Sequence, residues 1–346
     1  MQYQLEKESK IFVYCPSGAV TGGAELLHQL VDILNNNGRE AYIVYFGRQV
    51  DSVIPDDYIK YNIRIANDIE DDSKNVVVLY EGYFKKLFEI KKAQVFLWWL
   101  SVDNYFTSQQ YEITIADCWN FNKKLVPGVL LRQLLRLKMY KKNHFSLKQL
   151  SQNPQVVLNG YQSEYAHLFL RDHKFTNLVR LKDYVNTDNF RDINYSLKED
   201  IVVYNPKKGM NFTKKLIENA PDIKWIPIIN MNRNKVIETL SRAKVYIDFG
   251  HHPGKDRLPR EAAMNGCCII TGKRGSAGIY EDIPIPSQYK FNQKSQDIDI
   301  ILYTIRNCIT DYDSCIGDFI SYRDHIFNEK SEFENDVIKI FVNENC

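Results

Sequence analysis

The sequence predicts an α/β protein with two doubly wound, mainly parallel sheets, and three observations lead to this prediction. Short apolar runs rich in β-branched and aromatic residues alternate with helical patterns in both halves of the chain. The 346 residues suffice for two domains. Several strands end in loops that contain glycine, as in sheets that bind ligands beyond the carboxyl ends of their strands.

The first half alternates strands with helical segments. A glycine loop follows the first strand and leads into a helix with apolar residues at helical spacing, which Gly38 ends. That loop is not G-x-G-x-x-G, so the dinucleotide-binding fingerprint is absent. The strands expected here are 11–14, 41–47, 75–83, 94–106, 155–160 and 179–185.

A polar stretch without periodic apolar residues, near residues 186–199, is predicted to link the two domains. A strand and its loop are then expected over 201–209, further strands at 223–230, 243–250 and 267–270, and helices from about residue 297 to the end. We therefore predict an N-terminal domain of residues 1–190 and a C-terminal domain of residues 199–325, which face each other across a cleft.

The overall charge and composition exclude some classes of protein. A net charge of +2 excludes a chain that binds polyanions over its whole surface, and we expect no nucleic-acid partner. The first ten residues lack an apolar signal region, and no apolar run approaches the roughly 20 residues of a membrane helix. The seven cysteines form no C-x-x-C pair. We expect a cytoplasmic protein with reduced thiols.

Residues 122–142 form an unusually basic segment. From Lys123 to Lys142 it has seven Lys or Arg and no acidic residue, and its leucines share one helical face opposite Arg132 and Arg136. Two interpretations stay open. The helix packs on its own domain with a solvated basic side, or it is an amphipathic helix that contacts an anionic membrane surface, which makes the protein peripheral to the membrane.

Residues 251–278 carry the most informative pattern. An apolar strand ends in a loop with Lys255 and Arg257, a helix begins with Pro259 and Glu261 in its first turn, and the next strand releases a second glycine loop. Glycines let backbone N–H groups approach a ligand, and the cations add positive charge. The pattern predicts a site for a phosphate or diphosphate.

Four segments together resemble the GT-B glycosyltransferases, nearest to the retaining GT4-type group. They are TGGAELLHQLVDILNNNG near the N-terminus, VVLNGYQSEYAHLFL with the later YVNTDNF, NPKKG at the start of the second half, and PGKDRLPREAAMNGCCIITGKRGSAG. The resemblance implies two Rossmann-like domains, with C-terminal residues 326–346 packing back on the N-terminal domain.

The resemblance also implies roles for individual residues. Glu261 matches the glutamate that holds the ribose hydroxyls, and Lys208 matches the lysine that meets the donor diphosphate. Two loops match family loops that line the diphosphate, and their residues are Gly22, Gly23, Gly275, Ser276 and Ala277.

The chain departs from the family pattern at two places. Pro253 stands where the family has its first glutamate, although Gly254 matches the glycine that follows it. The arginine expected before the NPKKG loop is replaced by Asn205 and Lys207, so Lys207 or Arg257 would supply its charge.

Glycosyl transfer releases a diphosphate whose developing charge must be stabilised. No D-x-D motif lies in a suitable loop, so we expect no metal and no cofactor besides the nucleotide-sugar donor, with Lys208, Lys255 or Arg257 in place of a metal. Asp256 either has a polar role near the sugar or pairs with a neighbouring cation. The adjacent His251 and His252 lack carboxylate or cysteine partners at the spacing of metal ligands.

Acceptor residues are predicted at the end of strand 94–106. Trp98 and Trp99 offer rings for stacking on a sugar, beside Asp103 and Asn104. Asp103 is the candidate general base if the reaction inverts, with Glu81 as a weaker candidate.

We therefore predict a hexosyl-type glycosyltransferase that uses a nucleotide-diphosphate sugar and a glycan or lipid-linked glycan acceptor, as in bacterial surface polysaccharide synthesis. The alternatives are a nucleotide-sugar epimerase of the same fold and a non-catalytic subunit that binds a glycan or a partner enzyme.

Overall fold

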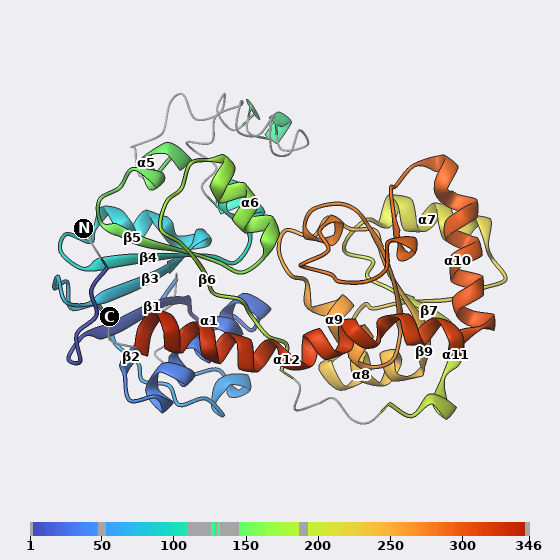
Figure 1. Cartoon of the computed structure of the whole chain (residues 1–346), viewed down its shortest axis with the longest axis horizontal. Helices are drawn as coiled ribbons and strands as arrows, with labels where there is room; N and C mark the ends of the chain where they lie inside the picture. Colours follow the sequence, from blue (N-terminus) through green and yellow to red (C-terminus); the bar gives the residue numbers. More distant parts are fainter. Residues whose placement is uncertain are drawn as a thin grey trace. The chain divides into compact units, whose positions relative to one another are not determined.

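A computed structural model describes residues 3–47, 53–108, 126–128, 130–131, 145–186 and 193–342. The chain divides into two compact units, each built around one parallel sheet (Figure 1). The first unit comprises Met1–Gln162, Ala166–Lys182 and Phe333–Cys346; the second comprises Ser163–Tyr165 and Asp183–Glu332. The predicted α/β class with two parallel sheets is confirmed.

The first unit has a six-stranded sheet in the order β2-β1-β3-β4-β5-β6. Every pair is parallel, and β1 lies between β2 and β3, which is where the strand order reverses. Its elements are β1 (Lys10–Pro16), α1 (Gly22–Asn36), β2 (Glu40–Phe46), β3 (Val76–Tyr80), β4 (Gln94–Trp99), α2 (Val102–Ser108), α5 (Leu147–Ser151), β5 (Val156–Tyr161), α6 (Glu164–Asp172) and β6 (Leu178–Arg180).

The predicted strand 94–106 is too long. β4 ends at Trp99, and α2 begins at Val102. Tyr105 and Phe106 are buried, so their apolar character belongs to the packed side of a short helix and not to a strand. A run of aromatic residues fits both a buried strand and a buried helix, which is why the sequence pattern did not separate them.

The second unit has a five-stranded parallel sheet in the order β11-β10-β9-β7-β8. The two-residue strand β11 was not predicted, because two residues show no periodicity. The elements of this unit are β7 (Glu199–Tyr204), α7 (Met210–Asn219), β8 (Lys224–Pro227), α8 (Arg233–Arg242), β9 (Ala243–Asp248), α9 (Arg257–Met264), β10 (Cys268–Gly272), β11 (Lys290–Phe291), α10 (Ile298–Thr310), α11 (Tyr312–Cys315) and α12 (Ile320–Val337).

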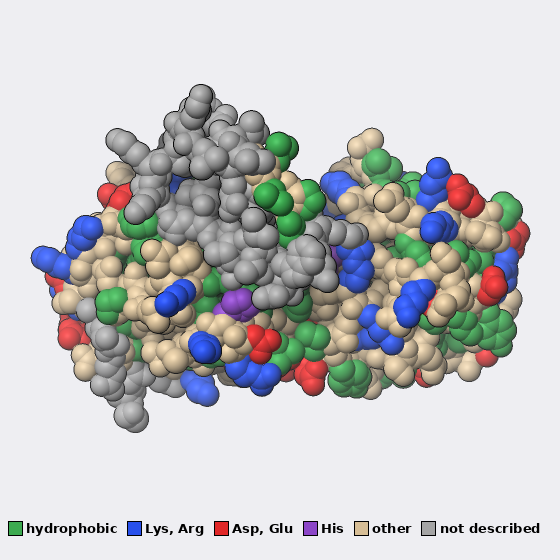
Figure 2. Space-filling view, turned by 90° about the horizontal axis from the view of Figure 1, so that it is seen from above, with side chains coloured by type: hydrophobic (Ala, Val, Ile, Leu, Met, Phe, Trp, Pro, Cys, Tyr) green, Lys and Arg blue, Asp and Glu red, His purple; other side chains and the backbone are tan. Residues whose placement is uncertain are grey.

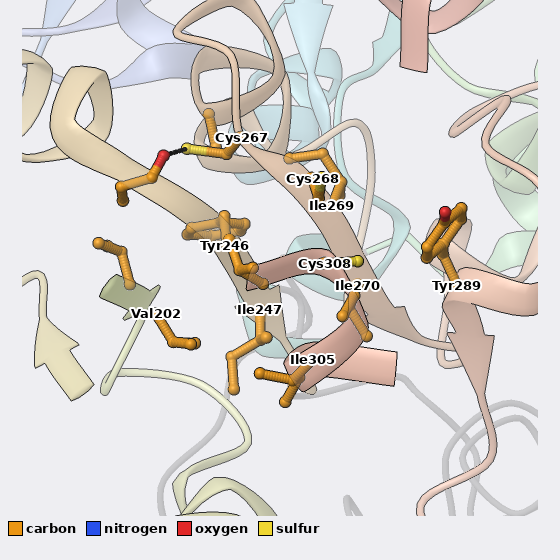
Figure 3. Packing of buried hydrophobic residues seen from close by; sticks show 14 of the residues in the cluster. Val202, Tyr246, Ile247, Cys267, Cys268, Ile269, Ile270, Tyr289, Ile305 and Cys308 are labelled. Carbon is orange, nitrogen blue, oxygen red and sulfur yellow. Dashed lines mark hydrogen bonds between the residues drawn. The ribbon is translucent and has the colours of Figure 1, made fainter. Parts of the chain in front are cut away.

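Helices cover both faces of the second sheet, as a doubly wound arrangement requires. Helix α7 contacts α10, and α8 contacts α9. Figure 1 shows these two pairs on opposite sides of the strands. The core between them is formed by the strands β7, β9 and β10 and by α10, and includes Tyr246, Ile270 and Ile305 (Figure 3). Its cysteines, Cys267, Cys268, Cys308 and Cys315, are buried and free.

A single half-buried lysine donates hydrogen bonds at the ends of two helices in this unit. The ammonium of Lys198 donates hydrogen bonds to Leu240 O at 3.2 Å, Ala243 O at 2.8 Å and Asn265 O at 2.7 Å. These carbonyls lie at the C-terminal ends of α8 and α9, where a positive charge is favourable. Burial lowers the pKa of Lys198 below its ordinary value.

In the described part of the chain, no helix combines the length and the apolar character needed to cross a membrane. On the face shown in Figure 2, Lys and Arg side chains are interspersed with Asp and Glu, in keeping with the small net charge. Of the basic segment 122–142, only residues 126–128 and 130–131 are described, so both interpretations of it remain predictions.

Candidate functional site

The second sheet reverses its strand order at β7, which lies between β8 and β9. In open α/β sheets, ligands bind beyond the carboxyl ends of the strands at such a point. The loop 205–209 follows β7, and the loop 249–256 follows β9. These loops hold most of the predicted donor residues of the second unit.

Two glycines bring these loops into contact. Gly209 has φ of 65°, and a Cβ there would lie 2.3 Å from Phe249 O. A Cβ on Gly250 would lie 2.4 Å from the Cβ of Lys208. Only glycine fits at either position, so Lys208 is held close to the end of β9.

The loop after β9 is also fastened to the loop after β10. The amide of His252 donates to Arg274 O at 3.2 Å, and the amide of Ser276 donates to His252 O at 2.9 Å. The hydroxyl of Ser276 donates to Gly254 O at 2.6 Å. Gly275 has φ of 69°, and a Cβ there would lie 2.0 Å from His252 O. Both hydrogen-bond donors of Ser276 therefore fasten the loops, and Ala277 beside it is fully buried.

Four charged or ionisable side chains form a row that begins with Lys208. The ammonium of Lys208 lies 2.5 Å from Asp256 Oδ2, and that oxygen lies 3.6 Å from His252 Nδ1. On the other side of the ring, His252 Nε2 lies 3.3 Å from Asp248 Oδ1. Asp248 and His252 are buried, whereas the side chains of Lys208 and Asp256 are 32% and 20% exposed. The row therefore runs from the interior toward solvent.

The inner carboxylate, Asp248, is firmly held. It accepts hydrogen bonds from Gly250 N at 2.8 Å and from the hydroxyl of Tyr246 at 3.0 Å. Burial would raise the pKa of Asp248, but the contact with His252, the amide of Gly250 and the charge of Lys208 together lower it below its ordinary value. Asp248 therefore carries a negative charge next to His252.

Among the described residues, Asp248, His252 and Asp256 are the group whose side chains could hold a metal ion, with ligand atoms within 4.8 Å of one another. The ammonium of Lys208 already lies at hydrogen-bond distance from Asp256. The ammonium of Lys208 thus occupies the Asp256 oxygen that a bound metal ion would need as a ligand.

Glu261 lies on α9, with 2% of its surface exposed. Its Oε1 lies 2.5 Å from an Nη of Arg233, the first residue of α8, whose side chain is 42% exposed. Helix α9 begins at Arg257, two residues before Pro259, so Glu261 is its fifth residue and lies beyond the first turn. The predicted first-turn position is therefore wrong, although the carboxylate is present at this end of the unit.

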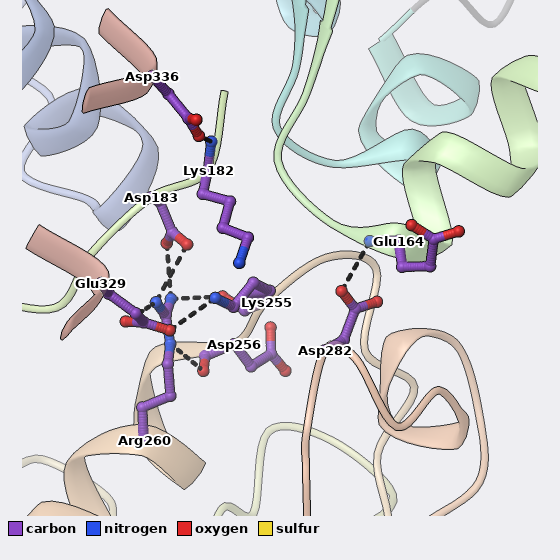
Figure 4. A network of polar contacts seen from close by, with 9 residues as sticks. All are labelled: Glu164, Lys182, Asp183, Lys255, Asp256, Arg260, Asp282, Glu329 and Asp336. Carbon is purple, nitrogen blue, oxygen red and sulfur yellow. Dashed lines mark hydrogen bonds and ion pairs between the residues drawn. The ribbon is translucent and has the colours of Figure 1, made fainter. Parts of the chain in front are cut away.

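The ammonium of Lys255 is turned away from solvent. Lys255 is 6% exposed, and its Nζ lies 2.6 Å from Glu329 Oε1 (Figure 4). The same glutamate accepts a hydrogen bond from Arg260, which also binds Asp183. We correct the prediction that Lys255 binds the donor, since its charge is committed to a buried carboxylate.

No model of a protein family matches this chain, and no curated protein matches it by sequence. Solved structures do match. Sucrose-phosphate synthase from Thermosynechococcus elongatus matches with a TM-score of 0.61 at 11% identity, over 96% of this chain and 97% of that one. HepE from Anabaena, in complex with UDP-glucose, matches with a TM-score of 0.58 at 9% identity, over 95% and 98%. The chain has the GT-B fold.

A third match is a larger protein with the GT-B fold. TarM of S. aureus, in complex with Fondaparinux, alpha-GlcNAc-glycerol and UDP, matches with a TM-score of 0.54 at 12% identity. The match covers 80% of this chain but only 57% of TarM, so this chain spans little more than half the length of that relative. At these identities the matches establish the fold.

The remaining donor residues of this GT-B chain lie around the same loops. Lys207 is exposed, and its amide donates to Asn205 Oδ1 at 3.0 Å, which shapes the turn after β7. Arg257 is half-buried at the start of α9, and Gly254 is buried beneath Ser276. None of these contacts involves a ligand, so their donor role stays a prediction.

The predicted acceptor residues belong to the first GT-B unit, and two of them need correction. Trp98 and Trp99 have no exposed surface, and the indole of Trp98 donates to Leu181 O at 3.0 Å. Trp99 packs against Phe84, Tyr105 and Phe175. Both rings are core residues and cannot stack on a sugar.

Asp103 and Asn104 begin α2 in this unit, half-buried and exposed respectively. Asn104 Nδ2 donates to Glu81 Oε1 at 3.4 Å, and Glu81 also accepts from Leu100 N at 2.9 Å. Burial raises the pKa of Glu81 to about 7, against the lowering effect of these hydrogen bonds.

The glycines of the first loop lie at the start of α1. Gly22 and Gly23 are its first two residues, after Thr21, whose hydroxyl accepts from Ala24 N at 3.3 Å. A Cβ on Gly23 would meet only Leu100 Cδ1, at an ordinary 3.8 Å. The backbone therefore does not require glycine at this position.

Sequence analysis missed Asp248, Arg233 and Glu329. Asp248 ends a buried strand, and a charged residue at that point was a usable signal. Arg233 and Glu329 carried none, since each lies in an ordinary polar helix pattern and meets its partner only through the tertiary fold.

Proposed function

We propose that this chain is a hexosyl-type glycosyltransferase that moves a sugar from a nucleotide-diphosphate donor to a glycan or lipid-linked glycan. The observation that supports this most is the position of Lys208 in the loop after β7, where the strand order of the second sheet reverses, together with the buried carboxylate of Glu261 on α9. HepE, which shares the fold, was solved with UDP-glucose, and TarM with UDP.

The proposed chemistry follows from these two groups. The acceptor hydroxyl attacks the anomeric carbon, the bond from that carbon to the β-phosphate oxygen breaks, and the nucleoside diphosphate leaves with the electron pair. If the configuration is retained, the leaving phosphate oxygen takes the acceptor proton. The ammonium of Lys208 would stabilise the charge that develops on this leaving group. The carboxylate of Glu261 would accept hydrogen bonds from the ribose hydroxyls.

We propose that the reaction uses neither a metal ion nor a cofactor besides the donor. The ammonium at Asp256 supports this, because a lysine supplies the positive charge that a metal would otherwise bring to the leaving group. Asp256 would have a polar role near the donor sugar. Asp103 would take the acceptor proton if the configuration inverts.

Replacement of Lys208 or Glu261 by alanine tests the proposal. We expect the wild-type chain to gain thermal stability from at least one of UDP, GDP, ADP, CDP and dTDP or their sugars, because a ligand that binds only the folded state stabilises it. Either substitution should abolish that gain and lower transfer or donor hydrolysis by about 100-fold.

The matched control is Lys214→Ala, which removes an exposed lysine of α7 paired with Glu218 at 3.6 Å. It should leave binding and activity unchanged. Release of a changed free nucleotide sugar without acceptor would favour the epimerase. A wild-type chain that binds a glycan or partner enzyme but no member of the nucleotide panel would favour the non-catalytic subunit and reject our proposal.

We further propose a role in the synthesis of bacterial surface polysaccharide at the cytoplasmic face of the membrane, with residues 122–142 as the contact. Seven basic residues in that segment would bind anionic lipid. Vesicles of phosphatidylglycerol and phosphatidylcholine should sediment the chain at low salt, and the double substitution Arg132→Ala/Arg136→Ala should weaken this. Equal sedimentation with purely neutral vesicles would contradict the membrane role.

A further inference from the structure

Neither ring nitrogen of His252 has a hydrogen bond of good geometry, although the side chain has no exposed surface. A buried polar atom without a partner costs free energy, so such an atom calls for an explanation. Nε2 faces Asp248 at 3.3 Å, and Nδ1 faces Asp256 at 3.6 Å. Each of these carboxylates is an acceptor, so a ring nitrogen that bears a proton can donate to it.

Asp256 lies closer to Lys208 than to His252. Its Oδ2 lies 2.5 Å from the ammonium of Lys208, about 1 Å nearer than the histidine. Both side chains of this pair reach the solvent-facing end of the row. Lys208 is therefore accessible to a ligand, but it is already neutralised by its neighbour.

A diphosphate that binds Lys208 must compete with Asp256. If Asp256 kept its charge without compensation, it would repel the phosphate oxygens at close range. An N–H at Nδ1 of His252 offers the released carboxylate a second hydrogen-bond donor, and closing the gap from 3.6 Å would complete the hydrogen bond that Nδ1 lacks.

We propose that Asp256 exchanges partners when a diphosphate binds, passing from Lys208 to His252, so that His252 is a positioning residue of the donor site. This inference rests on the proposed function only for the identity of the ligand. Asp248 would keep the imidazole ring in place, since Asp248 is itself fixed by Gly250 N and by the hydroxyl of Tyr246.

The exchange predicts opposite effects of two substitutions on affinity for a nucleoside diphosphate. Asp256→Asn removes the internal competitor for Lys208 and should tighten binding several-fold, whereas His252→Gln leaves Asp256 on the lysine and should weaken binding about tenfold. In the double variant the loss should disappear, because His252 acts only through the charge of Asp256. Binding of the parent nucleoside should not change in any variant.

The measurement is isothermal titration with the member of the UDP, GDP, ADP, CDP and dTDP panel that binds best, with its nucleoside, and with inorganic pyrophosphate. Asp222→Asn is the matched control, since it removes an exposed carboxylate paired with Arg306 in the same unit. Asp256 is on the surface side, so its variant tests the exchange even if His252→Gln does not fold.

Two results would overturn the exchange. One is weaker diphosphate binding by Asp256→Asn, which would make Asp256 an anchor of Lys208. The other is a loss in His252→Gln that persists in the double variant or extends to the nucleoside, as expected of a merely structural histidine. If pyrophosphate follows the predicted pattern while every nucleotide fails to bind, the exchange stands and the proposed function fails.

Discussion

Replacing Arg260 by methionine should destabilise the second unit by about 3–5 kcal/mol, because two buried carboxylates would lose their shared cation. Arg260 is 1% exposed. Its guanidinium donates to Asp183 at 3.0 and 2.6 Å and to Glu329 at 2.8 Å (Figure 4). The free energy of opening, measured by hydrogen exchange of the β9 amides in increasing urea, gives the loss.

Arg306→Met provides the comparison. Arg306 pairs with Asp222 at 2.9 Å, but both side chains are largely exposed, so little change is expected. Glu329→Gln should also destabilise the unit, because the buried ammonium of Lys255 would lose its carboxylate while Asp183 would still neutralise Arg260. If Arg260→Met proved as stable as Arg306→Met, the buried network would not hold this unit together.

The pH dependence of stability should reveal the ionisation of the buried Glu81 carboxyl group in the first unit. Its pKa in the folded chain is about 7, above the ordinary value of 4.5, because burial disfavours the charged form. The stabilisation is therefore complete below about pH 4.5, and it is lost as pH rises through 7. Relative to Glu81→Gln, the wild-type free energy of unfolding should fall by about 3 kcal/mol between pH 5 and 8.

Asp71→Asn is the control for this titration. Asp71 also accepts backbone hydrogen bonds, from Lys91, Lys92 and Ala93. Although burial raises the pKa of Asp71, these hydrogen bonds lower it below its ordinary 3.8. Its difference from wild type should stay constant from pH 5 to 8. Urea unfolding at each pH provides the values, and a flat difference for Glu81→Gln would show that its carboxylate is already ionised at pH 5.

Periodicity was enough to predict every strand but the two-residue β11, because most of the strands are short buried runs bounded by glycine or polar residues. β7, β9 and β10 lie within a few residues of the predicted spans. The end of β4 was misplaced, since residues 94–106 are apolar through both a strand and a helix. Helix α9 begins at Arg257, so Pro259 lies in its first turn as predicted, whereas Glu261 lies beyond it.

The site was harder to predict than the fold. Residue type and spacing pointed to Lys208, Asp256 and Glu261, but they could not show which cations are already paired. Lys255 and Lys208 look equivalent in sequence, yet one is buried on Glu329 and the other reaches solvent. The burial of Trp98 and Trp99 likewise depends on packing across distant parts of the chain, which no local pattern reports.

The glycines of the site loops have a consequence for how this chain can diverge. At Gly209 and Gly275 the backbone of one loop occupies the space that a side chain on the other would need, and at Gly250 the side chain of Lys208 occupies it. Inherited variation is thereby confined to outward-facing neighbours such as Arg233 and Tyr280, which are exposed. Related proteins can acquire new ligand preferences by changing those exposed residues, while the backbone shape of the site loops stays constant.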